Sequence, residues 1–244
     1  MRNSRKLEAN GIGRKSKAKS LTTVIGSAIT PKYTEPIIPD DLTPFDIFNR
    51  CIKRAENLIN FHSEDKNPDE EHFCDAYRAS VVLTIAALDA YTRTVTIIKI
   101  KEKLKRKPKS TDPLYEYIKS IMSHDSLLES AMNDSFFTEI ENQISSDFQK
   151  KSFQGERKIS HYMSLAGYKN IIGMVATKSK KNEGILKEDL DRFTKRRHTI
   201  AHGGDYDISQ TPFKEFEIKK EYAVECHKVV SEFTKTLNEI CFKK

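Results

Sequence analysis

The sequence predicts an all-α fold, in which four long core helices form a bundle that carries a helical insertion and follows a disordered basic N-terminal tail. Apolar residues recur at intervals of three and four over long stretches, which is the period of an amphipathic helix. Strand-like alternation of useful length does not occur in the sequence. Charged residues make up 32% of the 244 residues and hydrophobic ones 37%, without any Trp, which is typical of a soluble, mostly helical protein.

The N-terminal residues 1–41 are predicted to be a flexible basic segment. They contain three prolines and several Gly, Ser and Lys residues, and they show little periodicity. Residues 1–20 alone carry seven Arg or Lys and one Glu, whereas all later residues together have 35 basic and 34 acidic residues. The basic balance is therefore mostly a property of the tail. Such a tail either holds nucleic acid or another anionic surface by counterion release, or it only solvates the chain end.

Residues 43–107 are predicted to form the first half of the helical core. Thr43 is a suitable N-cap for the first helix, with Asp46 at the third helical position. A second helix, from about Glu70 to Lys105, is apolar nearly all round at its centre, so we expect it in the middle of the fold. Asp89 lies on the apolar side of this second helix.

A helical insertion is predicted over residues 110–183. It contains several short amphipathic stretches, which are separated by turn residues and glycines. Its segment 151–157 is polar, and we expect this segment to be mobile.

Residues 185–242 are predicted to form the second half of the core. One helix runs from about Ile185 to His202 and is stopped by the glycine pair that follows. A long amphipathic helix then continues to the C-terminus. The complete helical domain is thus expected to span residues 42–244.

Several classes of protein fit the sequence poorly. Its longest apolar run, Val81 to Ala90, is broken by Asp89 and is shorter than the roughly 20 residues of a membrane span. The four cysteines are scattered and show no CxxC spacing, which argues against a disulfide or zinc framework. We therefore expect a cytoplasmic protein with reduced cysteines, without membrane contact and without a bound metal or other cofactor.

The helix that precedes the glycine pair interrupts its own apolar pattern. At about 100° per residue, one stripe of this helix contains Leu186, Leu190, Phe193, Arg197 and Ile200. Arg197 therefore stands where a core residue belongs. A buried guanidinium is costly unless an anionic or hydrogen-bonding group meets it. Such an interruption is expected at a functional site.

Two histidines, His198 and His202, follow this arginine closely. If the substrate were RNA, its own 2′-hydroxyl group would be the nucleophile, and cleavage would need only a base, an acid and a positive charge at the phosphate. Histidine is able to perform either proton transfer near neutral pH, and arginine binds phosphate oxygens bidentately. Arg197, His198 and His202 are thus candidate catalytic residues. Asp89 is the candidate supporting residue, which would fix the guanidinium or orient an imidazole.

Arg197 is followed by a polar residue, His198, by three further residues and by His202. This order, near the end of the penultimate helix of an all-helical chain, resembles the motif of the HEPN superfamily. The resemblance covers roughly residues 43–107 and 185–242, and it leaves out the insertion and the tail.

The resemblance implies a HEPN-like bundle in which Arg197, His198 and His202 are catalytic and Asp89 is the acidic residue on the facing helix. It also implies a metal-independent endoribonuclease, which acts as a toxin or as an anti-phage abortive-infection effector. The implied partners are RNA, a second copy of the chain in a homodimer, and an antitoxin or defence-system protein.

Other interpretations stay open at this point. His198 and His202 have a spacing that suits zinc ligands, although Thr199 stands where the zinc-protease pattern has Glu. Arg197 and Asp89 would also be compatible with a purely structural ion pair. The domain would then be a non-catalytic HEPN-like module that binds RNA or a partner protein, or a helical adaptor whose basic tail does the binding.

Overall fold

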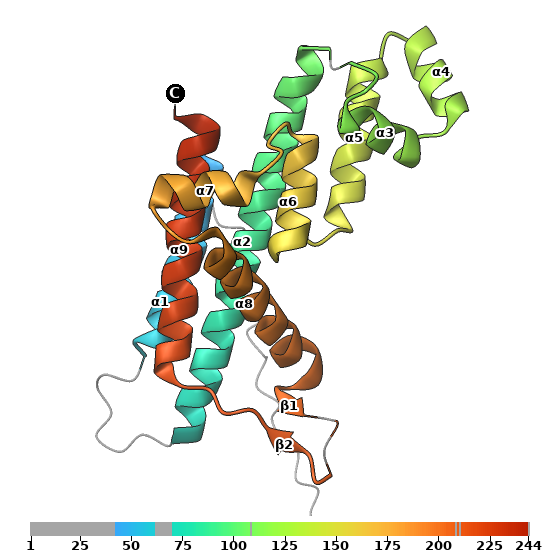
Figure 1. The fold of residues 1–244 in the computed structure, drawn as a ribbon. Coiled ribbons are helices and arrows are strands. Elements are labelled where there is room, and N and C mark those ends of the chain that lie inside the picture. Colours follow the sequence, from blue (N-terminus) through green and yellow to red (C-terminus); the bar gives the residue numbers. More distant parts are fainter. Residues whose placement is uncertain (1–41, 62–69, 108, 208, 210, 244) are drawn as a thin grey trace, which may run out of the picture. The chain divides into compact units, whose positions relative to one another are not determined.

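The structure, a computed structural model, describes residues 42–61, 70–107, 109–207, 209 and 211–243. In these residues the fold is all-α, as predicted, with a single small two-stranded sheet (Figure 1). The predicted basic segment 1–41 lies outside the described residues. The elements are α1 (Pro44–Ile59), α2 (Glu70–Lys105), α3 (Pro113–Ile121), α4 (His124–Met132), α5 (Phe136–Gln149), α6 (Glu156–Leu165), α7 (Ile171–Ser179), α8 (Glu183–Gly203), β1 (Tyr206–Asp207), β2 (Lys214–Glu215) and α9 (Lys220–Phe242).

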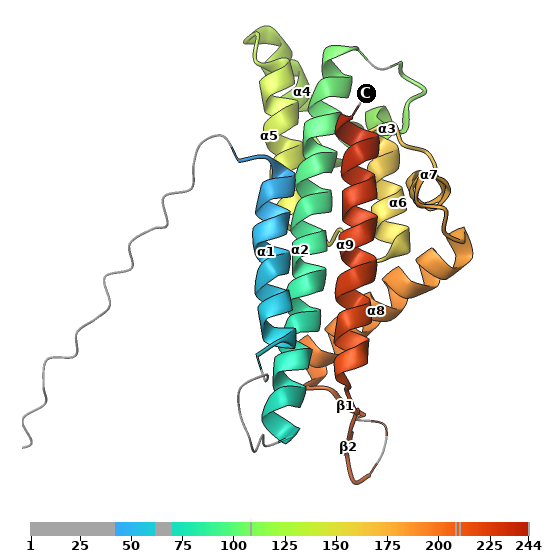
Figure 2. The ribbon, with the colours of Figure 1, turned by 90° about the vertical axis from the view of Figure 1, so that its left-hand side faces the viewer.

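Helices α1, α2, α8 and α9 form the predicted four-helix core. Figure 2 shows α1, α2 and α9 side by side, while α8 crosses against α2 and α9. The apolar side chains of these helices form one cluster, to which α8 contributes Leu186, Leu190 and Phe193. Each such fully buried side chain contributes about 1.5–3 kcal/mol of transfer free energy. The apolar stripe of α8 thereby fixes the helix that carries the candidate site.

A capping box starts α1, as the sequence predicts. The Thr43 side chain accepts the backbone N–H of Asp46 at 3.2 Å, and the Asp46 carboxylate accepts the backbone N–H of Thr43 at 3.0 Å. The hydrogen bonds from Thr43 lower the pKa of Asp46, which stabilises the charged form at the positive end of the helix.

Helix α2 runs through the middle of the bundle. By length and composition alone, its stretch Phe73–Lys105 would be able to cross a membrane. Half of the most apolar 18-residue window in this stretch is buried inside the protein. Side chains at its centre, such as Val81, Ile85 and Leu88, are fully buried in the core. The composition is therefore that of a helix which is surrounded by other helices.

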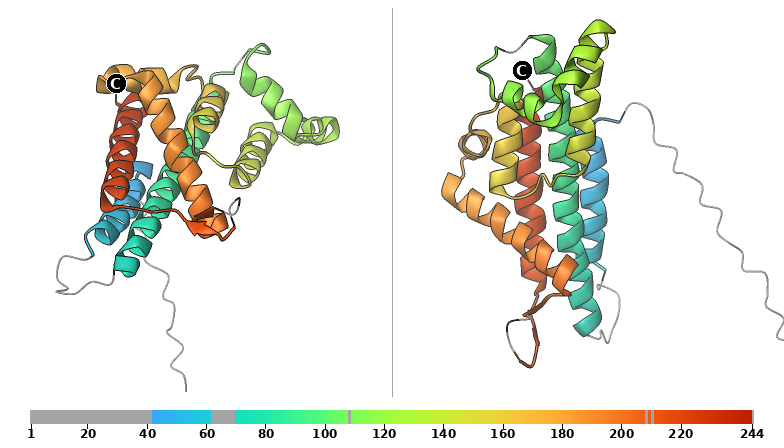
Figure 3. Two further views of the ribbon diagram at one scale, coloured as in Figure 1. Left: turned by 60° about the horizontal axis from the view of Figure 1, so that its bottom comes forward. Right: turned by 90° about the vertical axis from the view of Figure 1, so that its right-hand side faces the viewer.

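The predicted insertion, residues 110–183, divides between two apolar clusters. Helices α3 and α5 pack on the C-terminal part of α2 in a second cluster, which includes Leu104, Ile118 and Ile144. Figure 3 shows α3, α4 and α5 in green to yellow-green beside this part of α2. Helices α6 and α7 also contribute side chains to the main core, for example Ile159 of α6.

The polar segment 151–157 was predicted to be mobile, but in the structure it is anchored to the core. Phe153 is fully buried, its ring stacks on Tyr162 with centroids 4.2 Å apart, and it meets Phe148 edge-on at 4.9 Å. The backbone N–H of Phe153 also donates to Asp89 at 2.7 Å. One large aromatic residue buries enough surface to anchor an otherwise polar connection.

The four cysteines of the chain are free thiols. Cys226 and Cys241 are buried, and burial raises the pKa of Cys241 to about 11. Both therefore act as small apolar core residues.

Candidate functional site

The C-terminal end of α8 has a regular, well-supported conformation. The carbonyl oxygen of Thr199 accepts the backbone N–H groups of Gly204 and Asp205, the latter at 3.2 Å. Gly204 has φ 60°, a left-handed conformation that glycine adopts without steric cost. The chain then turns back through β1 and β2. His202 therefore lies in ordered helix rather than in a frayed end.

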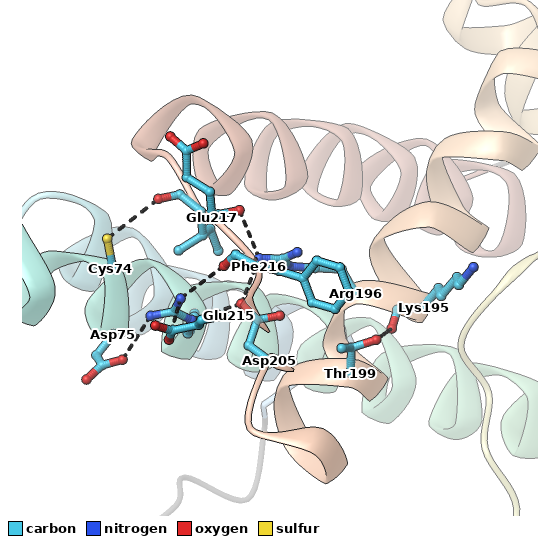
Figure 4. A network of polar contacts seen from close by, with 11 residues as sticks. Cys74, Asp75, Lys195, Arg196, Thr199, Asp205, Glu215, Phe216 and Glu217 are labelled. Carbon is cyan, nitrogen blue, oxygen red and sulfur yellow. Dashed lines mark hydrogen bonds and ion pairs between the residues drawn. The ribbon is translucent and has the colours of Figure 1, made fainter. Parts of the chain in front are cut away.

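A buried carboxylate ties this helix end to the bundle. Asp205 is fully buried, and its Oδ2 accepts Nε–H of Arg78 at 2.9 Å and Nη2–H of Arg196 at 2.7 Å. Arg78 comes from α2 and Arg196 from α8, so one oxygen joins two helices. Figure 4 shows Arg196 beside Asp205 and the residues that follow β2. Arg196 also donates to the carbonyl oxygens of Phe216 and Glu217, at 3.2 and 3.1 Å.

Arg78 is the most enclosed cation of this group. Its guanidinium also contacts Glu215 at 2.7 Å and Asp75 at 3.2 Å. Burial by itself lowers the pKa of Arg78, but the surrounding carboxylates, Asp205 above all, outweigh burial and raise it. Arg78 therefore stays charged. We call these five residues, Asp205, Arg78, Arg196, Glu215 and Asp75, the Asp205 cluster.

Arg197 differs from its neighbour Arg196 in its partners. Both arginines are half-buried, and the Nε atom of each has no accessible surface and no hydrogen-bond partner in the described part of the chain. Of the described arginines that are buried or half-buried, Arg78, Arg93 and Arg196 each bind a carboxylate, and Arg197 does not. A buried guanidinium is costly unless an anionic or hydrogen-bonding group meets it. Arg197 is therefore a candidate for binding an anion.

His198 and His202 are both exposed, in contrast to Arg197. They stand one turn apart on α8, and their ring centroids are 4.5 Å apart with the ring planes tilted by 47°. On a regular helix, residues five apart differ in direction by about 140°. The structure thus brings His198 and His202 together, but it points Arg197 and His202 of one chain to different sides.

Asp89, the predicted supporting residue, does not meet the motif residues. Its carboxylate forms a close ion pair with Arg93 and accepts the N–H of Phe153 at 2.7 Å and the hydroxyl of Ser152 at 3.4 Å. Arg93 follows Asp89 by four residues on the same helix, a spacing that places the two side chains next to each other. The Asp89 carboxylate therefore pairs with Arg93 and not with the motif arginine. The alternative of a structural Arg197–Asp89 pair is not what the structure contains.

A family model described as RiboL-PSP-HEPN matches residues 49–241. This range covers most of the chain, including the predicted insertion 110–183 and the motif. The chain belongs to the HEPN superfamily. Neither the curated proteins nor the solved structures gave a match in the comparisons made with this chain.

Family membership makes this chain a HEPN-type module that is RNase-like or RNA-related. In this HEPN chain, the motif residues Arg197, His198 and His202 occupy the last two turns of α8. The arginine is half-buried and the two histidines are exposed. Within the described residues, no group of three or more His, Cys, Asp or Glu side chains is arranged to hold a metal ion.

The sequence reasoning missed the roles of Arg78 and Arg196. For Arg196, the sequence contained part of the information. Two consecutive arginines on a helix differ in direction by about 100°, so Arg196 and Arg197 contact different neighbours. Asp205, directly after the glycine pair, was the carboxylate best placed to meet one of them. Nothing local indicated Arg78, which is 127 residues away from Asp205.

Proposed function

We propose that this HEPN protein is a metal-independent endoribonuclease that uses Arg197, His198 and His202 on the RNA backbone. The observation that supports the proposal is the state of Arg197, a half-buried cation without a carboxylate. A guanidinium in this state gains most from a planar or tetrahedral anion with two accessible oxygens, and a phosphodiester is such an anion. The two exposed imidazoles supply a candidate base and a candidate acid for the proton transfers.

The proposed reaction needs no nucleophile from the protein. The 2′-hydroxyl oxygen attacks the adjacent phosphorus while one imidazole accepts its proton. The bond from phosphorus to the 5′-oxygen then breaks, and a protonated imidazole gives that oxygen a proton. The products are a 2′,3′-cyclic phosphate and a free 5′-hydroxyl. Arg197 stabilises the negative charge of the phosphorane, and His198 and His202 are assigned to the two proton transfers.

A homodimer is part of the proposal, because one chain does not present Arg197 and His202 to the same point. Helix α8 is continuous through Gly203, so no unwinding turns His202 toward Arg197. A two-fold axis brings two copies of one patch together. Arg197 of one protomer and His202 of its partner are then able to line a single cleft for RNA.

Cleavage of a defined RNA by the full chain in EDTA tests the mechanism. We expect cleavage to persist and to leave 2′,3′-cyclic phosphate ends. His202→Ala should lower the rate by about 10²–10⁴-fold, with little effect on thermal stability because the side chain is exposed. His124→Ala, at the exposed start of α4, is the matched control.

Loss of activity on chelation, with rescue by zinc or magnesium, would contradict the metal-free mechanism. A wild-type chain that binds RNA without cleaving it would instead be the non-catalytic HEPN module.

Mixing two inactive variants tests the shared site. Arg197→Ala chains are combined with His202→Ala chains and allowed to exchange. About a quarter to a half of the activity returns if each half-site uses one Arg and one His from opposite chains, and none returns if one composite site needs all four. A fully active monomer, seen by light scattering at the assay concentration, refutes the shared site.

We further propose that the enzyme acts in the cytoplasm as a toxin or abortive-infection effector, held in check by an antitoxin or another defence-system protein. Expression of the wild type should then arrest growth, and His202→Ala should relieve the arrest. Sequencing of cellular RNA ends in the two cultures would identify the cleaved RNA. Equal growth of both cultures, with the same RNA ends, contradicts this role.

A further inference from the structure

We propose that His198 and His202 together form a bidentate site for a divalent transition-metal ion, Zn²⁺ in the first place, and that the bound ion blocks RNA cleavage. The metal site follows from the geometry of α8 alone. Its effect on cleavage rests on the proposed function above.

The two imidazoles are spaced as two ligands of one ion are. They project from the same side of an ordered helix, one turn apart, with ring centroids separated by 4.5 Å. A zinc–nitrogen bond is about 2.0–2.1 Å long, and the centre of the ring lies about 1.2 Å beyond the nitrogen. Two imidazoles at ligand angles of roughly 90–110° therefore have centroids about 4.5–5.2 Å apart. The observed separation falls in this range without movement of the backbone.

The surroundings leave the ligand atoms available. Both histidines are exposed, and neither imidazole has a hydrogen-bond or ion-pair partner among the residues that the structure describes. No third protein ligand accompanies them there, so water completes the coordination shell. Lys195 and Arg197 flank the pair and repel a further cation. We therefore expect a reversible site of moderate affinity rather than a structural one.

Metal binding and proton transfer compete for the same electron pairs. An imidazole nitrogen that coordinates zinc is unable to accept a proton, and a base or acid of the cleavage reaction is lost with it. Zinc at His198 and His202 should thus switch the enzyme off, and a chelator should switch it on. This sign is opposite to that of an enzyme that uses the metal for catalysis.

Calorimetric titration of Zn²⁺ into the full chain tests the site without any measurement of activity. The wild type should bind one ion per chain through the pair. His198→Ala and His202→Ala should each weaken that binding at least about tenfold, because half of the protein ligands are lost. His161→Ala, an exposed histidine on α6, is the control and should bind as the wild type does.

The outcomes separate the site from the function. Absence of zinc binding in the wild type, or zinc binding by either alanine variant that is as strong as that of the wild type, overturns the metal site. Cleavage that zinc stimulates, or leaves unchanged while the site is filled, overturns the blocking role. A chain that never cleaves RNA but loses zinc binding in both variants refutes the proposed function and upholds the metal site.

Discussion

Replacement of Asp205 by alanine removes the carboxylate oxygen that joins α2 to α8. Removal of one partner from a buried ion pair costs about 3–5 kcal/mol, because the other charge stays buried without compensation. Two features reduce this cost here. Arg78 keeps Glu215 and Asp75, and Arg196 keeps two backbone carbonyl oxygens. We therefore expect Asp205→Ala to lower the free energy of unfolding by about 3 kcal/mol, at the lower end of that range.

Urea unfolding of the full chain, followed by far-UV circular dichroism, measures this loss. In a chain of this size, 3 kcal/mol corresponds to a decrease of about 6–12 °C in Tm. Glu56→Ala is the matched control, because Glu56 and Lys53 form an ion pair of similar length, 2.7 Å, on the surface of α1. Exposed pairs contribute about 0–1 kcal/mol. A loss at Asp205 no larger than the loss at Glu56 would refute the reasoning, since burial would then have no effect.

The remaining predictions concern the helix cap, the second cluster, the tail and the motif arginine. Thr43→Ala should cost about 1 kcal/mol in chemical denaturation. Because Thr43 depresses the pKa of Asp46, this difference should be present above the unfolded pKa and shrink as the pH falls through the folded one; a pH-independent difference contradicts it. Phe153→Ala should cost about 3–5 kcal/mol, and a loss below 1 kcal/mol would show that the ring does not anchor its segment. Deletion of residues 1–20 should flatten the salt dependence of RNA binding, and an unchanged slope would exclude the tail from the contact. Arg197→Lys keeps the charge but is unable to donate two parallel hydrogen bonds to a phosphate, so it should cleave RNA more slowly than the wild type. An unchanged cleavage rate would contradict bidentate phosphate binding.

The helices of the core are predictable because their signals are local. The cap at Thr43 and the apolar period that follows it need only a few neighbouring residues. The same holds for α2, whose observed span, Glu70–Lys105, agrees with the predicted one. The end of α1 at Ile59 is less predictable, because helix ends depend on weaker signals than helix centres.

Contacts between residues that are far apart in the chain could not be predicted from the sequence pattern. The polar run 151–157 contains one aromatic residue, Phe153, whose burial requires Phe148 and Tyr162 on two other elements. Its polar composition predicted a mobile segment, and the tertiary contact overrides this local preference. The same applies to Asp89, which was expected to meet the motif from a facing helix.

The choice between two neighbouring arginines shows the same limit within the site. From the sequence, Arg196 and Arg197 have the same charge and reach, and only their directions differ. The carboxylate of Asp205 lies on the side of Arg196 and binds it, whereas Arg197 has no carboxylate partner in the described residues. The Asp205 cluster thus has two effects at once. It ties the C-terminal end of α8 to α2, and it pairs the carboxylate that follows the glycine pair with Arg196 rather than with Arg197.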